Sequence, residues 1–129
     1  MRYLAFATDF DGTLARHDTV PEAAVAALQR LRTSGRRAIL VTGRRVDDLL
    51  EHCDCVGLFS RAVAENGAVL YNPATRERTR LADPLPTRLV DTLRARGVDP
   101  LEIGQVLVGT PITAPRLRTP SGNSAWRCR

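Results

Sequence analysis

Apolar residues in this chain form short runs separated by segments with helical spacing. Mainly apolar runs occupy positions 3–8, 37–41 and 61–64. Between them, residues 21–35 and 43–53 place apolar side chains three or four positions apart, as on one face of a helix. Strands that alternate with helices predict βαβ units. We therefore expect an α/β fold with a parallel sheet of buried strands.

A ligand site is predicted at one edge of this sheet. Right-handed crossovers bring the carboxyl ends of parallel strands to the same edge. Three loops follow the three predicted strands, at residues 9–14, 42–45 and 65–68. Open α/β sheets bind their ligands at such an edge, so we expect these loops to meet around a functional site.

The pattern then changes from alternating strands and helices to a hairpin. Residues 68–71 and 76–81 flank an Asn-Pro turn and predict two antiparallel strands. Pro86 marks a boundary, after which the spacing predicts a short helix that ends near Gly97 and a strand at residues 103–108.

Three regions are therefore expected along the chain. Residues 1–85 form a core, and residues 86–109 begin a second, smaller module. Residues 110–129 are rich in Pro, Arg, Ser and Gly and show no apolar periodicity, so we expect them to be disordered.

The positive charge of the chain is concentrated in that last region. The net charge is +5 over 129 residues, a length typical of one domain. Residues 1–109 hold 15 Arg and 14 acidic residues, whereas residues 110–129 hold four Arg and no acid. A nearly neutral body makes a nucleic-acid partner unlikely, although binding of RNA by the tail stays an alternative. All 19 basic residues are arginine, and the chain contains no lysine.

The expected location is the cytoplasm. No stretch approaches the roughly 20 apolar residues that span a membrane, and Asp9 and Asp11 interrupt any signal-peptide core. The three cysteines are expected to be reduced thiols. His52, Cys53 and Cys55 lie close together, but a structural zinc site needs four good ligands, so a buried helix end with incidental thiols is the favoured interpretation.

Two carboxylates dominate the candidate chemistry. Asp9 and Asp11 leave the first predicted strand together, in the sequence Asp-Phe-Asp-Gly-Thr-Leu. One carboxylate can attack phosphorus and form an aspartyl-phosphate, while the other transfers a proton to the leaving group and from water. A divalent cation would offset the repulsion between carboxylate and phosphate. Gly12 allows a tight turn whose backbone amides are candidates to bind phosphoryl oxygens.

A second signal follows the second predicted strand. Thr42, Gly43 and Arg44 combine a hydroxyl, a helix start and a guanidinium, which together favour an anion site. Each signal has a structural alternative: a capped turn for the two aspartates, a helix N-cap for Thr42, and a solvated helix face for Arg44. Asn66 begins an Asn-Gly pair that is also typical of a tight hairpin turn.

These segments resemble the haloacid dehalogenase-like (HAD) superfamily. The sequence from Asp9 to Leu14 resembles its first motif, Val41–Arg44 resembles the second motif of the Cof-like sugar-phosphatase branch, and Glu65–Ala68 resembles a turn of that branch. The resemblance covers roughly residues 3–109. It implies a Rossmann-type parallel sheet with helices on both faces, followed by the start of an α+β cap.

The resemblance also implies roles for single residues. Asp9 is the nucleophile and a Mg²⁺ ligand, and Asp11 is the general acid and base, binding Mg²⁺ through its backbone carbonyl. Thr42, Gly43, Arg44 and Asn66 are the expected substrate- and phosphate-binding residues. The implied reaction is Mg²⁺-dependent hydrolysis of a phosphate monoester, with a small phosphorylated metabolite, such as a sugar phosphate, as substrate. The oligomeric state is left open.

The chain departs from the family in its second half. The family uses a lysine, or sometimes an arginine, in a third motif and an acidic cluster in a fourth. This sequence has no lysine and no Asp or Glu after Glu102. We therefore expect a truncated or frameshifted product, and the alternative function is an inactive fragment or a binding module. Downstream DNA that encodes neither a lysine nor an Asp-rich motif in any frame would count against truncation.

Overall fold

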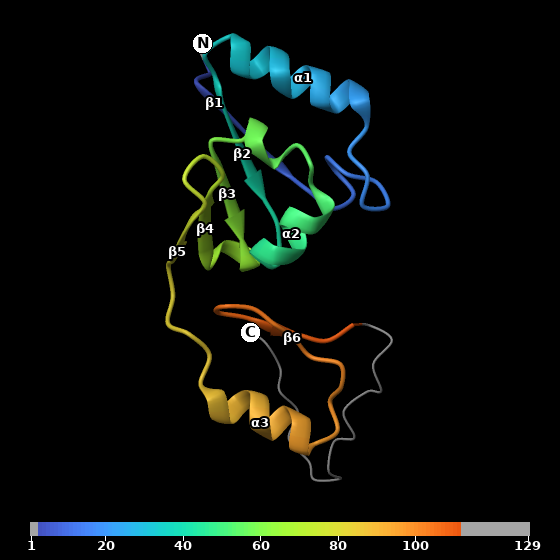
Figure 1. Ribbon diagram of the computed structural model, residues 1–129, viewed down its shortest axis with the longest axis vertical. Coiled ribbons are helices and arrows are strands. Elements are labelled where there is room, and N and C mark those ends of the chain that lie inside the picture. The colour runs from blue at the N-terminus through green and yellow to red at the C-terminus, as the bar shows by residue number, and fades with distance from the viewer. Residues whose placement is uncertain (1–2, 112–129) are drawn as a thin grey trace, which may run out of the picture. The chain divides into compact units, whose positions relative to one another are not determined.

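The computed structural model describes residues 3–111, which form two compact units (Figure 1). The first unit contains the chain up to Leu85 together with Gly104–Leu107, and the second contains Pro86–Ile103 and resumes at Val108. The identity of the second unit as the start of a cap stays a prediction. The predicted tail, residues 110–129, lies almost entirely outside the described residues.

The first unit is built on a five-stranded sheet with the order β1-β2-β3-β4-β5. The strands are β1 (Ala5–Asp9), β2 (Arg37–Val41), β3 (Arg61–Ala64), β4 (Val69–Asn72) and β5 (Glu77–Arg80). The pairs β1–β2 and β2–β3 are parallel, whereas β3–β4 and β4–β5 are antiparallel. The predicted α/β fold and the hairpin after residue 67 are therefore confirmed, in a mixed sheet.

Two helices connect the parallel strands. α1 (Glu22–Thr33) begins after Pro21, which is compatible with a helix start because its ring fixes φ and it lacks an N–H group. α2 (Val46–His52) carries Asp47 and Asp48 in its first turn, where negative charge is favourable. The short 3₁₀ helices η1 (Val56–Leu58) and η2 (Glu65–Gly67) lead into and out of β3.

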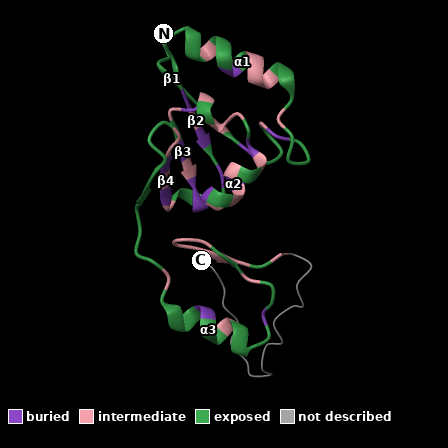
Figure 2. Ribbon diagram, in the orientation of Figure 1, coloured by how far each residue is buried: buried purple, intermediate pink, exposed green. Residues whose placement is uncertain are grey.

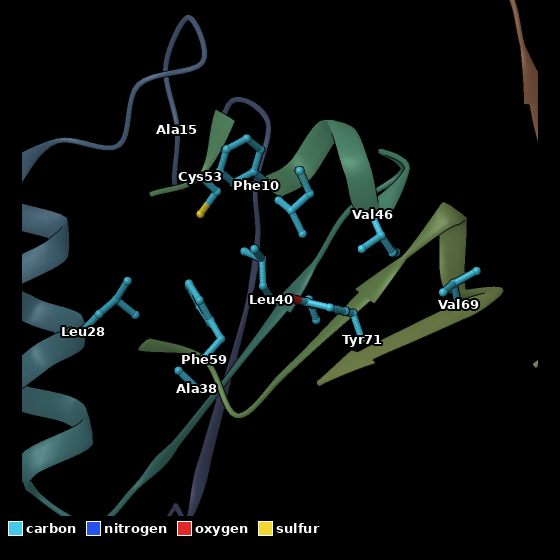
Figure 3. Close-up of a cluster of buried hydrophobic side chains, with 13 residues drawn as sticks. Phe10, Ala15, Leu28, Ala38, Leu40, Val46, Cys53, Phe59, Val69 and Tyr71 are labelled. Carbon is cyan, nitrogen blue, oxygen red and sulfur yellow. The ribbon is translucent and has the colours of Figure 1, made fainter. Parts of the chain in front are cut away.

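The core lies along β2, β3 and β4, where buried positions gather (Figure 2). Its fully covered members include Phe10, Leu40, Leu49 and Val69, and Figure 3 shows several of these side chains clustered together. Phe10 is 0% exposed although it belongs to the acidic loop after β1. Burial of this ring therefore fixes the loop against the body of the unit.

The first strand is less covered than its sequence predicts. β1 is an edge strand within the described chain, and Leu4 and Phe6 are 71% and 48% exposed. The prediction of a buried strand at residues 3–8 was wrong in this respect, because its apolar run does not reveal whether a neighbouring strand covers it. An apolar groove of about 600 Å³ runs beside it, lined in part by Phe6, Leu14, Leu28 and Leu31.

The second unit contains the predicted short helix, α3 (Thr87–Ala95). The single strand predicted at residues 103–108 is instead a small hairpin of β6 (Glu102–Ile103) and β7 (Val108–Gly109). The Gly104 amide donates to the Leu107 carbonyl over 2.8 Å and closes the turn between these strands. Over residues 3–111, no helix is long and apolar enough to cross a membrane.

Candidate active site

The three loops predicted to meet at one edge of the sheet do so. The amide of Phe10 donates to the Val41 carbonyl over 3.2 Å, which joins the first loop to the second strand. The amide of Thr42 donates to the Val63 carbonyl over 2.9 Å, and that of Glu65 donates to the Arg44 carbonyl over 2.9 Å. Backbone hydrogen bonds thus fix the positions of the three loops relative to one another.

Asp9 ends β1, and its carboxylate is exposed. The hydroxyl of Thr13 donates to Asp9 Oδ2 over 3.1 Å, so the loop orients this carboxylate. Asp11 follows on the same loop, and its side chain is 54% exposed. Both carboxylates are accessible to a ligand while the residue between them, Phe10, is buried.

The amides of the acidic loop are largely engaged in its own turn. Those of Gly12, Thr13, Leu14 and Ala15 all donate to backbone carbonyls of residues 9–15. Gly12 adopts the positive φ that the tight turn requires, at 73°. The predicted phosphoryl-binding amides of this loop are therefore not among these four.

Arg44 lies among three carboxylates. Its Nη2 is 2.6 Å from Asp11 Oδ1, its Nε lies 3.0 and 3.1 Å from the two Asp11 oxygens, and its Nη1 is 3.3 Å from Asp48 Oδ2. Nη2 also pairs with Asp18. The guanidinium carbon lies 5.1 Å from the centre of the Phe10 ring, a cation–π contact. The planar side chain therefore holds Asp11 in place.

This cluster changes the acidity of its members. The hydrogen bonds that Arg44 donates to Asp11, followed by the one it donates to Asp18, raise the pKa of Arg44 further above its ordinary value. The hydrogen bond from Arg44 lowers the pKa of Asp18. His52 lies 3.3 Å from the Asp48 carboxylate. Its pKa is raised, chiefly by the hydrogen bond to the Asp48 backbone carbonyl and to a smaller extent by the negative charge of Asp48. The pair of Arg44 and Asp18 therefore favours the charged form of both side chains.

Thr42 lies at the carboxyl end of β2 and is 2% exposed. Its Oγ1 accepts a hydrogen bond from the Arg44 amide over 3.1 Å, while the helix itself begins only at Val46. The hydroxyl therefore stabilises the turn before α2, as a cap of that turn, and the helix N-cap is Arg45.

Gly43 and Asn66 pack directly against each other. A β-carbon at Gly43 would lie 2.8 Å from Asn66 Oδ1, closer than real contacts allow. The Asn66 amide also donates to the Thr42 carbonyl over 3.3 Å. The structure thus brings Asp9, Asp11, Thr42, Gly43, Arg44 and Asn66 to one edge of the sheet.

The sequence matches the haloacid dehalogenase-like hydrolase family over residues 6–97. This chain belongs to that family. The matched region contains both loop aspartates, the Thr42 loop and the Asn66 turn. Among curated proteins, none matches the chain.

Solved structures of HAD proteins share this fold. A haloacid dehalogenase-like hydrolase from Bacteroides thetaiotaomicron is 21% identical with a TM-score of 0.63. The match covers 75% of this chain and 39% of that one. One from B. subtilis is 24% identical with a TM-score of 0.58, covering 73% of this chain and 33% of that one. The subclass IIB sugar phosphatase BT4131 is 21% identical with a TM-score of 0.53, at 79% and 42% coverage. The chain therefore spans about two fifths or less of these relatives.

Glu65 is a structural residue of this HAD site whose partners the sequence did not indicate. Its side chain is 3% exposed and accepts hydrogen bonds from the backbone amides of Gln105, Val106 and Leu107, over 3.0, 2.8 and 3.2 Å. A carboxylate bound by three amides is well compensated for its burial. The resemblance of Glu65–Ala68 to a turn of the family drew attention to this residue but gave no indication of its partners.

Asp9 and Asp11 are the candidate metal ligands of this chain. Across residues 3–111, no group of three or more His, Cys, Asp or Glu side chains is placed to hold a metal ion, and this includes the neighbourhood of His52, Cys53 and Cys55. Mg²⁺ commonly uses only one or two carboxylates and completes its octahedron with water and phosphate oxygens. Asp9 and Asp11, both exposed and oxygen-only, are compatible with that pattern.

Proposed function

We propose that this chain carries the nucleophilic half of a Mg²⁺-dependent phosphate-monoester hydrolase site. The observation that carries the proposal is the placement of Asp9 and Asp11 on one loop at the end of β1, joined by hydrogen bonds to the Thr42 loop of β2. Membership of the haloacid dehalogenase-like hydrolase family supports it.

Asp9 is the proposed nucleophile. One of its carboxylate oxygens forms a bond to phosphorus while the bond from phosphorus to the leaving oxygen breaks. A protonated Asp11 gives its proton to that leaving oxygen. Water then attacks the aspartyl-phosphate, Asp11 takes a proton from the water, and the bond between phosphorus and Asp9 breaks. The products are an alcohol and inorganic phosphate.

Arg44 and Thr42 support this reaction in different ways. Arg44 binds Asp11 through two nitrogens, which fixes the orientation of the acid and base. Thr42 is the proposed hydroxyl partner of the transferring phosphoryl group, and Gly43 and Asn66, which pack against each other, are further proposed substrate-binding residues. Contact of Arg44 or Asn66 with the substrate remains a prediction.

A divalent cation is part of the proposal. Asp9, through its carboxylate, and Asp11, through its backbone carbonyl, are the proposed ligands for Mg²⁺. When bound, the cation supplies positive charge that offsets the repulsion between the Asp9 carboxylate and the phosphate. The remaining Mg²⁺ positions are those that water and phosphate oxygens usually occupy.

A sugar phosphate is the proposed substrate class. The support is the similarity to BT4131, a sugar phosphatase of HAD subclass IIB, together with the Thr-Gly-Arg sequence at residues 42–44. Expected substrates are small, water-soluble phosphate monoesters.

The decisive experiment measures release of nitrophenol from an aryl phosphate by the purified chain with Mg²⁺. We expect Asp9→Asn to reduce the rate about a thousandfold or more, because it removes the nucleophile. Asp11→Asn should reduce it about 10²–10⁴-fold, the usual contribution of general acid–base catalysis. Asp83→Asn, an exposed acid away from the loops, is the matched control. Equal rates for Asp9→Asn and the wild type would refute the proposal.

A binding function without turnover is the second candidate. It would require only the predicted anion site at Thr42, Gly43 and Arg44. Calorimetric titration with Mg²⁺ and inorganic phosphate separates the two. Phosphate binding that Thr42→Val weakens, in a sample that releases no nitrophenol, would establish the binding module.

A further inference from the structure

Two cysteines lie next to each other at the end of α2. Cys53 is the C-cap residue of the helix and is 1% exposed, as part of the core shown in Figure 3. Cys55 is half-buried. Their sulfur atoms are 3.6 Å apart, within hydrogen-bonding distance for sulfur.

The buried cysteine is firmly held. Its amide donates to the Leu49 carbonyl over 2.9 Å, which continues the helical pattern. Its carbonyl accepts from the Val56 amide over 3.1 Å. Cys53 is therefore a fixed and shielded partner, while Cys55 lies on the solvent side of the pair.

Cys55 lines a depression of about 270 Å³ whose polar residues include Asp18, Thr19, His52 and Asp54. Cys55 is the less buried of the two cysteines and lies at this opening, whereas Cys53 lies in the core. Access is the property that separates a reactive thiol from an inert core cysteine.

The two thiols differ in their pKa values. The hydrogen bond between the two sulfurs lowers the pKa of Cys55 to about 7, although partial burial and the adjacent Asp54 act in the opposite direction. The same hydrogen bond, together with burial, raises the pKa of Cys53. The less buried sulfur, that of Cys55, is thus the one that carries negative charge near neutral pH, and the thiolate is the reactive form.

We propose that Cys53 and Cys55 are a thiol modification site that forms a reversible disulfide, with Cys55 oxidised first and Cys53 as the resolving thiol. The inference does not depend on the proposed phosphatase function, since neither sulfur belongs to that site.

The proposed oxidant is hydrogen peroxide. The Cys55 thiolate attacks one peroxide oxygen, the O–O bond breaks, and a proton taken up from solvent releases water, leaving a sulfenic acid. The Cys53 sulfur then attacks the Cys55 sulfur, the S–O bond breaks, and a second water leaves with the proton of Cys53. The two thiols lose two electrons and two hydrogens, and the peroxide is reduced to two waters. A dithiol such as dithiothreitol reverses the step by exchange.

The geometry requires only a local movement. The sulfurs must approach from 3.6 Å to about 2.05 Å, the length of a disulfide bond. Asp54 is the single residue between the cysteines. The Cys53 backbone takes part in two hydrogen bonds and the Cys55 carbonyl accepts one from the Leu58 amide, so side-chain rotation and the exposed Asp54 between them supply the adjustment.

The test is a mass measurement on the full chain after treatment with hydrogen peroxide and then an alkylating agent in denaturant. Trypsin leaves both cysteines in one peptide, residues 46–61, because no basic residue lies between Val46 and Ser60, whereas Cys128 falls in another. We expect peptide 46–61 to lose two hydrogens and to escape alkylation, and dithiothreitol to restore both. A bond to Cys128, or a sulfinic acid at Cys55 without a disulfide, would overturn the proposal.

A second measurement separates the roles of the two thiols. With Cys53→Ala, the sulfenic acid at Cys55 has no resolving partner, so it should be trapped by dimedone, whereas Cys55→Ala should leave Cys53 unlabelled. Alkylation of Cys55 at pH 7 should be about fivefold slower in Cys53→Ala if the pKa of Cys55 rises by one unit, because the thiolate fraction falls from about one half to about one tenth. Cys53→Ser, which keeps a donor, should retain most of the rate. Circular dichroism checks that each variant folds, and equal labelling of both cysteines in the folded wild type contradicts the assignment.

Discussion

The carboxylate of Glu65 lies 2.8 Å from the backbone amide of Val106, although 41 positions separate the two residues in the chain. The same oxygen accepts from Leu107, and the other carboxylate oxygen accepts from Gln105. A buried acid thus fixes the segment Gly104–Leu107 against the turn that follows β3. The first prediction concerns this anchor.

Replacing Glu65 should destabilise the fold measurably. Glu65→Ala leaves three amides without their acceptor and should cost about 2–4 kcal/mol in the free energy of unfolding. Glu65→Gln keeps one acceptor oxygen and should cost roughly half of that. Urea denaturation measures both, and hydrogen exchange should show faster exchange at Gln105, Val106 and Leu107. Unchanged protection of these amides in Glu65→Ala would contradict the anchor.

The contact between Gly43 and Asn66 predicts a rescue experiment. Gly43→Ala should destabilise the chain by about 1–3 kcal/mol, since the new β-carbon would lie 2.8 Å from Asn66 Oδ1. Adding Asn66→Gly removes the obstructing atom, so the double variant should recover most of the loss. Gly57→Ala, where nothing lies within 4 Å, is the matched control. Strictly additive effects in the double-mutant cycle would show that the two positions do not interact.

The Arg44 cluster predicts a change in acidity. The hydrogen bond from Arg44 lowers the pKa of Asp18, so Arg44→Met should raise that pKa toward its ordinary value. Because the folded pKa is below the unfolded one, this pair stabilises the fold above the unfolded pKa and loses that effect as the pH falls through the folded pKa. NMR titration of the Asp18 carboxyl carbon measures the shift. The same pKa in wild type and Arg44→Met would exclude the pairing in solution.

The exposed edge at β1 predicts limited solubility. Phe6 on β1 and Leu4 directly before it present apolar side chains at a strand with one unpaired side within the described chain. Such edges favour intermolecular pairing. Leu4→Lys and Phe6→Lys should raise the concentration at which the chain precipitates, with little change in circular dichroism. Leu81→Lys, at an exposed apolar position outside β1, is the control, and an equal gain from it would point to charge alone.

The amino-acid sequence by itself determined the local elements of this protein. Periodicity placed α1 and the strands β2 and β3 because apolar spacing depends on neighbours a few residues away. The order of strand, loop and helix also located the three loops at one edge, since parallel strands end together. The motif around Asp9 then identified the family.

The tertiary structure decided the relationships between distant residues. Periodicity within residues 3–8 could not show that β1 is an edge strand, because coverage depends on what lies beside it. The partners of Arg44 are up to 33 positions away, and those of Glu65 up to 42, so no local pattern indicated that Arg44 binds Asp11 or that Glu65 anchors Leu107. The segment 102–109 bends into a hairpin whose turn contains amides bound by that carboxylate. Side-chain hydrogen bonds across the fold, rather than the spacing of apolar residues, fix these features.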